Sequence, residues 1–171
     1  SNGKTVVKEW LYQMLSAPHS GTTIRSPRSY NSQIGVPLSV WRLDENTDLA
    51  IFAAGISQPG EMPQLRTMIQ PTIGILTNIG TAHQENFGSL EQKCLEKLQL
   101  FTEAKTIICP DTPLVNDCIA KLGLKAEIVH WTTDDKDKFC PPFPFTDKAS
   151  IENACICFAT LRQLGIDEQT I

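Results

Sequence analysis

Short apolar stretches alternate with helical patterns along almost the whole chain. The stretch from Leu49 to Ala54 is a continuous apolar run closed by Gly55, which is typical of a strand buried on both faces of a sheet. Further strands are expected at residues 22–24, 72–77, 106–109 and 126–131, and helices at residues 4–15, 33–43, 62–69, 90–102, 114–122 and 149–164. Repeated βα units of this kind predict the α/β fold class, with a mostly parallel sheet and helices on both faces.

The size and charge of the chain restrict what it binds. The 171 residues suit one domain with a sizeable core, so we expect a single domain over residues 1–171. The formal net charge of −4 argues against nucleic acid and anionic membranes as partners. No apolar run approaches the roughly 20 residues that cross a bilayer, and no signal peptide is visible. We therefore expect no membrane insertion and a cytoplasmic location.

Six cysteines raise the question of disulfides or a metal centre. Cys155 and Cys157 are the only close pair, no CxxC spacing occurs, and histidines at zinc-site spacing are missing. Most of the cysteines fall in expected helices or strands. The sequence therefore favours buried, reduced thiols in a cytosolic protein.

The first five residues, Ser1 to Thr5, read as the end of a phosphate-binding loop of the Walker type. In such a loop the glycine lets backbone N–H groups surround phosphate oxygens, the lysine contacts the β- and γ-phosphates, and the hydroxyl binds magnesium. The expected helix would point its positive N-terminus at those phosphates. A three-residue match is common by chance, and the alternative is a surface turn before an amphipathic helix. The strand and the glycine that lead into such a loop would precede Ser1, so we expect a domain truncated at its N-terminal strand.

Polar residues also follow the expected strands, where the ligands of parallel α/β sheets gather. Residues 55–61 follow one strand, and residues 77–83, which include Asn78 and His83, follow the next. Together with Lys97 on the helix beyond, these side chains would form a metal and phosphate environment beside the loop. The alternatives are a turn cap for Asn78, a surface position for His83 and a solvated helix lysine for Lys97.

Five ordered motifs resemble the Mur ligase family over nearly the whole chain. They are residues 26–39, 59–62, 77–83, 86–91 and 144–153. The chain is similar to the family's central ATP-binding domain, a P-loop NTPase-like α/β domain. Among family members it resembles most the ligases that join D-alanyl-D-alanine to UDP-N-acetylmuramoyl-tripeptide. Residues 26–33 and 144–153 are most similar to the form that is fused to an alanine racemase.

The resemblance implies a reaction in peptidoglycan synthesis. In this family ATP phosphorylates the carboxylate that ends the UDP-linked peptide, the amine of D-alanyl-D-alanine attacks the acyl phosphate, and phosphate leaves. Because a carboxylate is a poor electrophile, phosphorylation supplies the leaving group, and the protein positions the reactants and neutralises phosphoryl charge. The implied cofactors are ATP and Mg²⁺. The implied partners are the two substrates, the flanking UDP-binding and C-terminal ligase domains and, in the fused form, the racemase. Without the flanking domains we expect little or no ligase activity.

The resemblance also assigns roles at the phosphate loop. Lys4 would contact the β- and γ-phosphates, and Thr5 would hold the first magnesium ion. Asn2 and Gly3 would line the phosphate cradle, and Asn78 would contribute to the same cofactor site.

Further roles fall later in the chain. His83 matches the histidine near the second magnesium ion. Lys97 matches a lysine that Mur ligases carbamylate, a change that turns a cation into an anion able to help hold magnesium. With Lys4, these two residues form the expected catalytic set. Asn153 matches an asparagine that contacts adenine. The expected peptide-binding residues are Ser26, Asn31 and Ser32.

Two features depart from the family pattern. Ala53 occupies the place of a magnesium-binding glutamate, so one metal site loses a ligand, and residues 134–144 are shorter than the family's passage there. Ala53 motivates the alternative of a nucleotide-binding or scaffold module that has lost catalysis. A second alternative is a related amide ligase with another substrate, such as folylpolyglutamate synthase, against which residues 29–39 speak. A third is an α/β domain without a nucleotide site, which would make the ordered motifs a coincidence.

Overall fold

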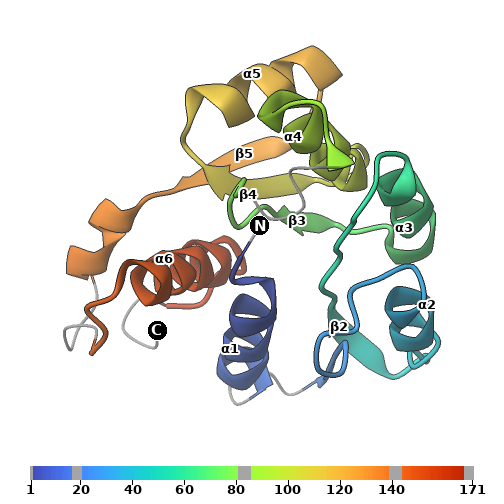
Figure 1. Ribbon diagram of the computed structural model, residues 1–171. Helices are drawn as coiled ribbons and strands as arrows, with labels where there is room; N and C mark the ends of the chain where they lie inside the picture. The colour runs from blue at the N-terminus through green and yellow to red at the C-terminus, as the bar shows by residue number, and fades with distance from the viewer. Residues whose placement is uncertain (1, 17–20, 81–85, 139–143, 168–171) are drawn as a thin grey trace.

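The computed structural model describes residues 2–16, 21–80, 86–138 and 144–167. In chain order the elements are α1 (Lys4–Ser16), β1 (Thr22–Arg25), α2 (Gly35–Val40), β2 (Thr47–Ile51), α3 (Glu61–Ile69), β3 (Ile73–Ile75), α4 (Leu90–Leu98), the 3-10 helix η2 (Gln99–Phe101), β4 (Thr106–Pro110), α5 (Pro113–Leu122), β5 (Glu127–Trp131), the 3-10 helix η3 (Thr133–Lys138) and α6 (Lys148–Gln163) (Figure 1). Every expected helix and strand is present. Some differ in extent. The helix expected over 33–43 is limited to α2, the strand expected over 49–54 ends at Ile51, and the strand expected over 72–77 pairs only along β3. The helix expected over 90–102 is α-helical to Leu98 and continues as η2. Within the described residues, no helix has the length and apolar character that a bilayer crossing requires.

The five strands pair in parallel, which confirms the expected α/β class. They form two sheets: one contains β1 and β2, and the other has the order β3-β4-β5. Among the described residues, β2 and β3 do not pair with each other, so the one sheet that the sequence predicted is divided into two. The two sheets are joined in sequence by α3.

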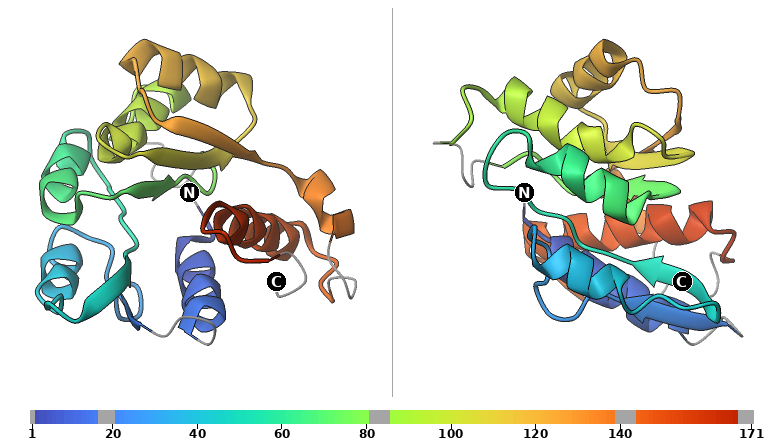
Figure 2. Two further views of the ribbon diagram at one scale, coloured as in Figure 1. Left: turned by 180° about the vertical axis from the view of Figure 1, so that it is seen from behind. Right: turned by 90° about the vertical axis from the view of Figure 1, so that its right-hand side faces the viewer.

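Helices cover both faces of the β3-β4-β5 sheet. The central strand β4 is buried over residues 106–109, and its side chains alternate in direction. Ile107 and Cys109 pack into the core built with α3, α4 and α5, whereas Ile108 packs into the core built with α1 and α6. Figures 1 and 2 show α4 and α5 on one side of this sheet and α6 on the other. The expectation of helices on both faces is confirmed.

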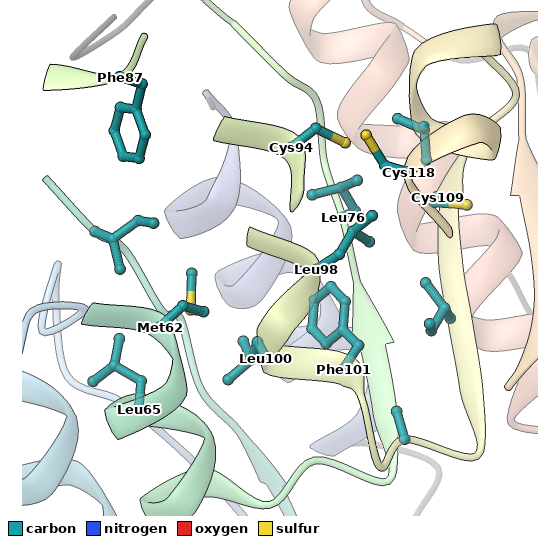
Figure 3. Close-up of a cluster of buried hydrophobic side chains, with 14 of the residues drawn as sticks. Met62, Leu65, Leu76, Phe87, Cys94, Leu98, Leu100, Phe101, Cys109 and Cys118 are labelled. Atoms are coloured by element: carbon teal, nitrogen blue, oxygen red, sulfur yellow. The ribbon is translucent and has the colours of Figure 1, made fainter. Parts of the chain in front are cut away.

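The cysteines belong to these two cores. Figure 3 shows the sulfur atoms of Cys94 and Cys118 turned toward each other between α4 and α5. The five cysteines in the described part of the chain are all buried, and none forms a disulfide. Burial raises the pKa of the Cys109 thiol to about 12 and that of the Cys155 thiol to about 11. These observations agree with the expected buried, reduced thiols; Cys140 lies outside the described residues.

Side-chain caps determine where the later helices begin. The helices α4, α5 and α6 follow Ser89, Thr112 and Asp147, whose side-chain oxygens accept the backbone N–H three residues on, at 3.0, 3.4 and 2.9 Å. Gly165, with a φ of 77°, follows the end of α6, as the sequence predicts. The long α6 therefore has a defined start and end, which fixes the position of the residues it carries.

Gly74 lies in β3 against the ring of Phe101. A Cβ atom on Gly74 would overlap with the ring carbons, and both residues are buried. We expect Gly74→Ala to lower the free energy of unfolding by about 1–3 kcal/mol, the usual cost of overpacking a core. Denaturant titration of both chains measures the difference. The double variant Gly74→Ala/Phe101→Leu should recover part of the loss, and no recovery would contradict the steric explanation.

Candidate functional site

The backbone at the start of α1 passes very close to α6. Gly3 has a φ of 83°, and a Cβ atom there would overlap with the Oδ1 atom of Asn153. The carbonyl oxygen of Gly3 accepts the N–H of Val7 at 2.9 Å, so the first turn of α1 begins at this glycine. Glycine is therefore required here for two independent reasons. The contact brings Gly3 and Asn153, both predicted from the sequence as nucleotide-site residues, to one place.

Asn78 holds the backbone that leads into α1. Its Oδ1 atom accepts the backbone N–H of Asn2 at 2.9 Å. Asn78 follows β3, so this bond ties the carboxyl end of β3 to the N-terminal end of α1. Asn78 therefore does more than cap a local turn, which was the alternative role for it, because its partner Asn2 is distant in the chain. The sequence predicted that Asn2 and Asn78 share a site, and the structure places them together.

Three lysines gather near the start of α1. Lys93 and Lys97 lie four positions apart on the buried face of α4, and Lys4 opens α1. Burial, followed by the nearby charge of Lys93, lowers the pKa of Lys4. Burial, followed by the charges of Lys4 and Lys93, lowers the pKa of Lys97 from 10.5 to about 8. Lys93 donates from its Nζ atom to the carbonyl oxygen of Gly80 at 2.6 Å.

This arrangement of positive groups suits an anion. Each amino group raises the cost of charging its neighbours, and a negative group between them would remove that cost. The backbone N–H groups in the first turn of the 13-residue helix α1 would add further donors. The backbone of Gly3, the amine of Lys4 and the start of α1 together form a cradle that fits a polyphosphate.

The fit to a metal ion is weaker. Among residues 2–16, 21–80, 86–138 and 144–167, no group of three or more His, Cys, Asp or Glu side chains is placed to hold a metal. Thr5, half-buried in the first turn of α1, offers one hydroxyl oxygen, and Lys97 would need to become an oxygen donor. His83, the predicted ligand near a second magnesium ion, lies outside the described residues. Most of the coordination of a magnesium ion here would come from phosphate oxygens and water.

The predicted peptide-binding residues lie in the loop after β1, against the segment after β2. Ser26 is fully buried, and its hydroxyl accepts the N–H of Ala53 at 3.3 Å. The carbonyl oxygen of Asn31 accepts the N–H of Gly55 at 2.7 Å, and the hydroxyl of Ser32 accepts the N–H of Gly35 at 3.2 Å. In this conformation Ser26 and Asn31 join the two segments, whereas Ser32 bonds within its own segment to the first residue of α2. The contact of these residues with a peptide stays a prediction.

Two glutamates close the loop that leads into α3. Glu61 accepts hydrogen bonds from the N–H groups of Ser57 and Gln58 at 2.7 and 3.0 Å, and the bond from Gln58 is the main reason why its pKa is lowered. Glu96, on α4, accepts the N–H of Gly60 at 2.7 Å. Glu61 is therefore engaged with its own loop rather than directed at the lysines. Glu96 had no role in the expectations from sequence.

Lys8 is a second residue that the sequence analysis did not single out. Its side chain is buried, and its Nζ atom donates to the carbonyl oxygens of Ser26 and Arg28 at 2.5 and 2.6 Å. It also pairs with Glu9 at 2.9 Å. The sequence signal for this burial is the position of Lys8 on the apolar face of α1, where Leu11 is also buried. Lys8 fixes the loop that carries the predicted peptide-binding residues.

The domain is a parallel α/β fold whose first helix follows Gly3 and opens with Lys4 and Thr5, near the buried Lys93 and Lys97 of α4. This arrangement resembles that of phosphate-binding loops. Residues 1–159 match the Mur ligase middle domain. The chain belongs to the Mur ligase family. Its expected resemblance to this family is confirmed.

Curated relatives and solved structures agree with this assignment. The chain is 36% identical over 130 residues to a UDP-N-acetylmuramoyl-tripeptide–D-alanyl-D-alanine ligase of Borreliella burgdorferi. The matched region covers 76% of this chain and 27% of that relative. It is 29% identical to the ligase of the same name from Synechocystis, covering 100% of this chain and 41% of the relative. Its fold matches MurF from Acinetobacter baumannii with a TM-score of 0.83 and 21% identity, over 99% of this chain and 42% of that one. It also matches MurF ligase from Thermotoga maritima in complex with ADP, with a TM-score of 0.77 and 18% identity, over 99% of this chain and 45% of that one. The chain thus spans less than half the length of these relatives.

Proposed function

We propose that this chain is the ATP-binding part of a ligase that joins D-alanyl-D-alanine to UDP-N-acetylmuramoyl-tripeptide through an acyl phosphate. The family membership and the names of the curated relatives support the reaction and both substrates. The longer relatives support the presence of flanking domains that bind the UDP-linked peptide and the dipeptide. Fusion to an alanine racemase is a further proposal that rests on residues 26–33 and 144–153.

The observation that carries this proposal is the convergence of Lys4, Lys93 and Lys97 at the N-terminus of α1. The lowered pKa values of Lys4 and Lys97 mean that the site is electropositive and poorly solvated before any ligand enters. In such a site Lys4 and the N–H groups of α1 would bind the β- and γ-phosphates and spread the charge of the transferring phosphoryl group. The proposed cofactors are therefore ATP and magnesium. Magnesium would supply further charge neutralisation, with Thr5 and, once modified, Lys97 as ligands, and His83 remains a proposed ligand.

Lys97 has the chemical properties that carbamylation requires. The neutral amine attacks CO₂, a C–N bond forms, and one proton is released to solvent. With a pKa of about 8, roughly a tenth of Lys97 is neutral at pH 7, whereas an ordinary lysine has well under a thousandth. The product is an anion near Lys4 and Lys93, whose charges act on Lys97, so the modification turns repulsion into attraction. We propose that Lys97 carries this group in the active enzyme.

The decisive experiment separates the ligase from a module that binds nucleotide without catalysis. The full-length protein is supplied with ATP, magnesium and both substrates, and phosphate release is measured. Release that requires both substrates supports the ligase. Nucleotide binding without phosphate release would favour the impaired module that Ala53 suggests.

Ala53 can be tested directly. Ala53 is buried and lines the same cavity as Lys4 and Lys97, so a carboxylate at this position would lie in a cavity that positive groups also line. We expect Ala53→Glu to strengthen magnesium-dependent ATP binding on the order of tenfold, measured by titration calorimetry with and without magnesium. Ala53→Gln has the same shape without the charge and should not strengthen binding. Equal affinities for the two variants would contradict a metal-binding role at this position.

A further inference from the structure

The buried amine of Lys8 uses its whole donor capacity inside the protein. Lys8 is 2% exposed, and its Nζ atom donates to the carbonyl oxygens of Ser26 and Arg28. The same Nζ atom lies 2.9 Å from one carboxylate oxygen of Glu9, whose other oxygen accepts from Arg25 at 2.6 Å. An ammonium group has three N–H donors, and these three oxygens match them in number. Lys8 is therefore committed to the turn that follows β1.

The turn around Lys8 has a backbone conformation that needs support. Arg28 has a φ of 47°, in the left-handed region that side-chain-bearing residues adopt only at a cost in energy. Its carbonyl oxygen is one of the two that Lys8 binds, and the other belongs to the fully buried Ser26. Without the amine, both carbonyl groups would lose this charged donor. The conformation of residues 26–28 therefore depends on Lys8.

The turn in turn holds the segment that follows β2. The hydroxyl of Ser26 accepts the N–H of Ala53, and the carbonyl oxygen of Asn31 accepts the N–H of Gly55 at 2.7 Å. Lys8 thus holds the loop after β1, and that loop is bonded to the segment after β2. A change in the turn at residues 26–28 would move both segments relative to α1.

The same helix presents the phosphate cradle. Lys4 and Lys8 are four positions apart on α1, so they share one face and lie about 6 Å apart along the helix axis. Both line a cavity of about 350 Å³ whose walls include residues of both sheets. The helix packs against β1 and α6, which fix its position. One turn of α1 therefore connects the expected phosphate contact to the loop that carries the predicted peptide-binding residues.

We propose that Lys8 is a positioning residue: it holds the peptide-binding loop on α1 and so sets where the carboxylate of the UDP-linked peptide lies relative to the γ-phosphate. This inference rests on the proposed function and adds a residue that acts through the loop. The attacking carboxylate oxygen must lie in line with the phosphorus atom and its leaving group. An error of about 1 Å in such an alignment can lower the rate about 100-fold.

The test uses the full-length protein and the variants Lys8→Met, Lys8→Arg and Leu15→Ala. Methionine keeps the length of the side chain and removes the charge, whereas arginine keeps the charge and the N–H donors. Leu15 is buried near the other end of α1, so its truncation destabilises the helix packing without removing a donor from the loop. Phosphate release is measured against the concentration of UDP-linked peptide, at saturating ATP and D-alanyl-D-alanine and well below each Tm. Titration calorimetry gives the affinity for ATP.

Lys8→Met should lower kcat/KM for the UDP-linked peptide about 100-fold and change the affinity for ATP less than about threefold. Lys8→Arg should recover part of this loss. Leu15→Ala should lower Tm and keep kcat/KM within about threefold of the parent. A loss in Lys8→Met no larger than that in Leu15→Ala would overturn the proposal. An equal loss of ATP affinity would also overturn it, because Lys8 would then act through the phosphate cradle.

Amide exchange separates a failure of this inference from a failure of the proposed function. A parent protein that releases no phosphate with both substrates present would contradict the ligase. The N–H groups of Ala53 and Gly55 then report on the loop, since Ser26 and Asn31 bind them. Without substrates, they should exchange at least about tenfold faster in Lys8→Met than in Leu15→Ala. Equal exchange in the two variants would show that Lys8 does not hold the loop.

Discussion

Replacing Lys4 by methionine should weaken ATP binding by the full-length protein by about 10- to 100-fold, which corresponds to the loss of one charge-assisted contact to phosphate. Lys4 is the first residue of α1, and the neighbouring Lys93 does not replace it, because its Nζ atom donates to the carbonyl oxygen of Gly80. Methionine keeps the length and the apolar stem of lysine, so the packing around residue 4 should persist. Titration calorimetry with ATP measures the change.

Lys105→Met is the matched control for this experiment. Lys105 is exposed at the start of β4, away from the lysines of α4, so its replacement should leave ATP affinity unchanged. The Tm of both variants shows whether a loss of binding comes from unfolding. If Lys4→Met bound ATP as tightly as the parent, Lys4 would not be a phosphate-binding residue.

Lys97→Met should increase stability and remove ligase activity at the same time. An unmodified ammonium at this buried position lies near two other lysines, and lowering its pKa from 10.5 to about 8 costs the folded state about 3 kcal/mol. Methionine removes the charge and keeps the volume. We therefore expect a higher free energy of unfolding for Lys97→Met at pH 7 in buffers free of CO₂. Phosphate release by the full-length variant should fall to background.

The pH dependence gives a second readout of the same group. Below pH 8 Lys97 is charged in both the folded and the unfolded chain, so the cost is fully present. Between pH 8 and 10.5 the folded chain loses its proton first, the unfolded chain binds more protons, and stability rises with pH. Lys97→Met should lack this rise. If the stability of the parent did not rise with pH relative to the variant between pH 8 and 10.5, the pKa of Lys97 would not be lowered in the folded protein.

Carbamylation adds a chemical control. In buffer with carbon-13 bicarbonate, the full-length parent should show a carbamate carbon signal that Lys97→Arg lacks, since the arginine side chain is not a nucleophile at this pH. Bicarbonate should also stabilise the parent against unfolding and leave Lys97→Met unaffected. A signal that persists in Lys97→Arg would place the modification elsewhere.

Local patterns predicted the elements well, while side-chain placement was harder to anticipate. The helix expected over residues 33–43 is shorter, since α2 ends at Val40, and its apolar residues Ile34, Leu38 and Trp41 are all exposed. Their spacing carries no information on whether another element packs against them. The same limit explains why a strand at 72–77 was expected at full length, since pairing depends on a neighbour that the pattern does not specify.

The site was predicted from motifs, and the contacts that position it were not. Gly3, Lys4, Asn78 and Lys97 were all identified from sequence. The burial of Lys8, by contrast, depends on carbonyl groups of a loop that follows β1. Such contacts join segments that are distant in the chain, and only a lysine on an otherwise apolar helix face hinted at them.

The buried cysteines also allow local opening of the two hydrophobic cores to be measured by thiol labelling. With Cys140 replaced by serine, a thiol reagent would reach Cys94, Cys109 and Cys118 only when the core between α4 and α5 opens. It would reach Cys155 and Cys157 only when the core under α6 opens. Labelling followed by peptide mass analysis would therefore measure the opening rates of the two cores separately, with no cysteine introduced as a probe.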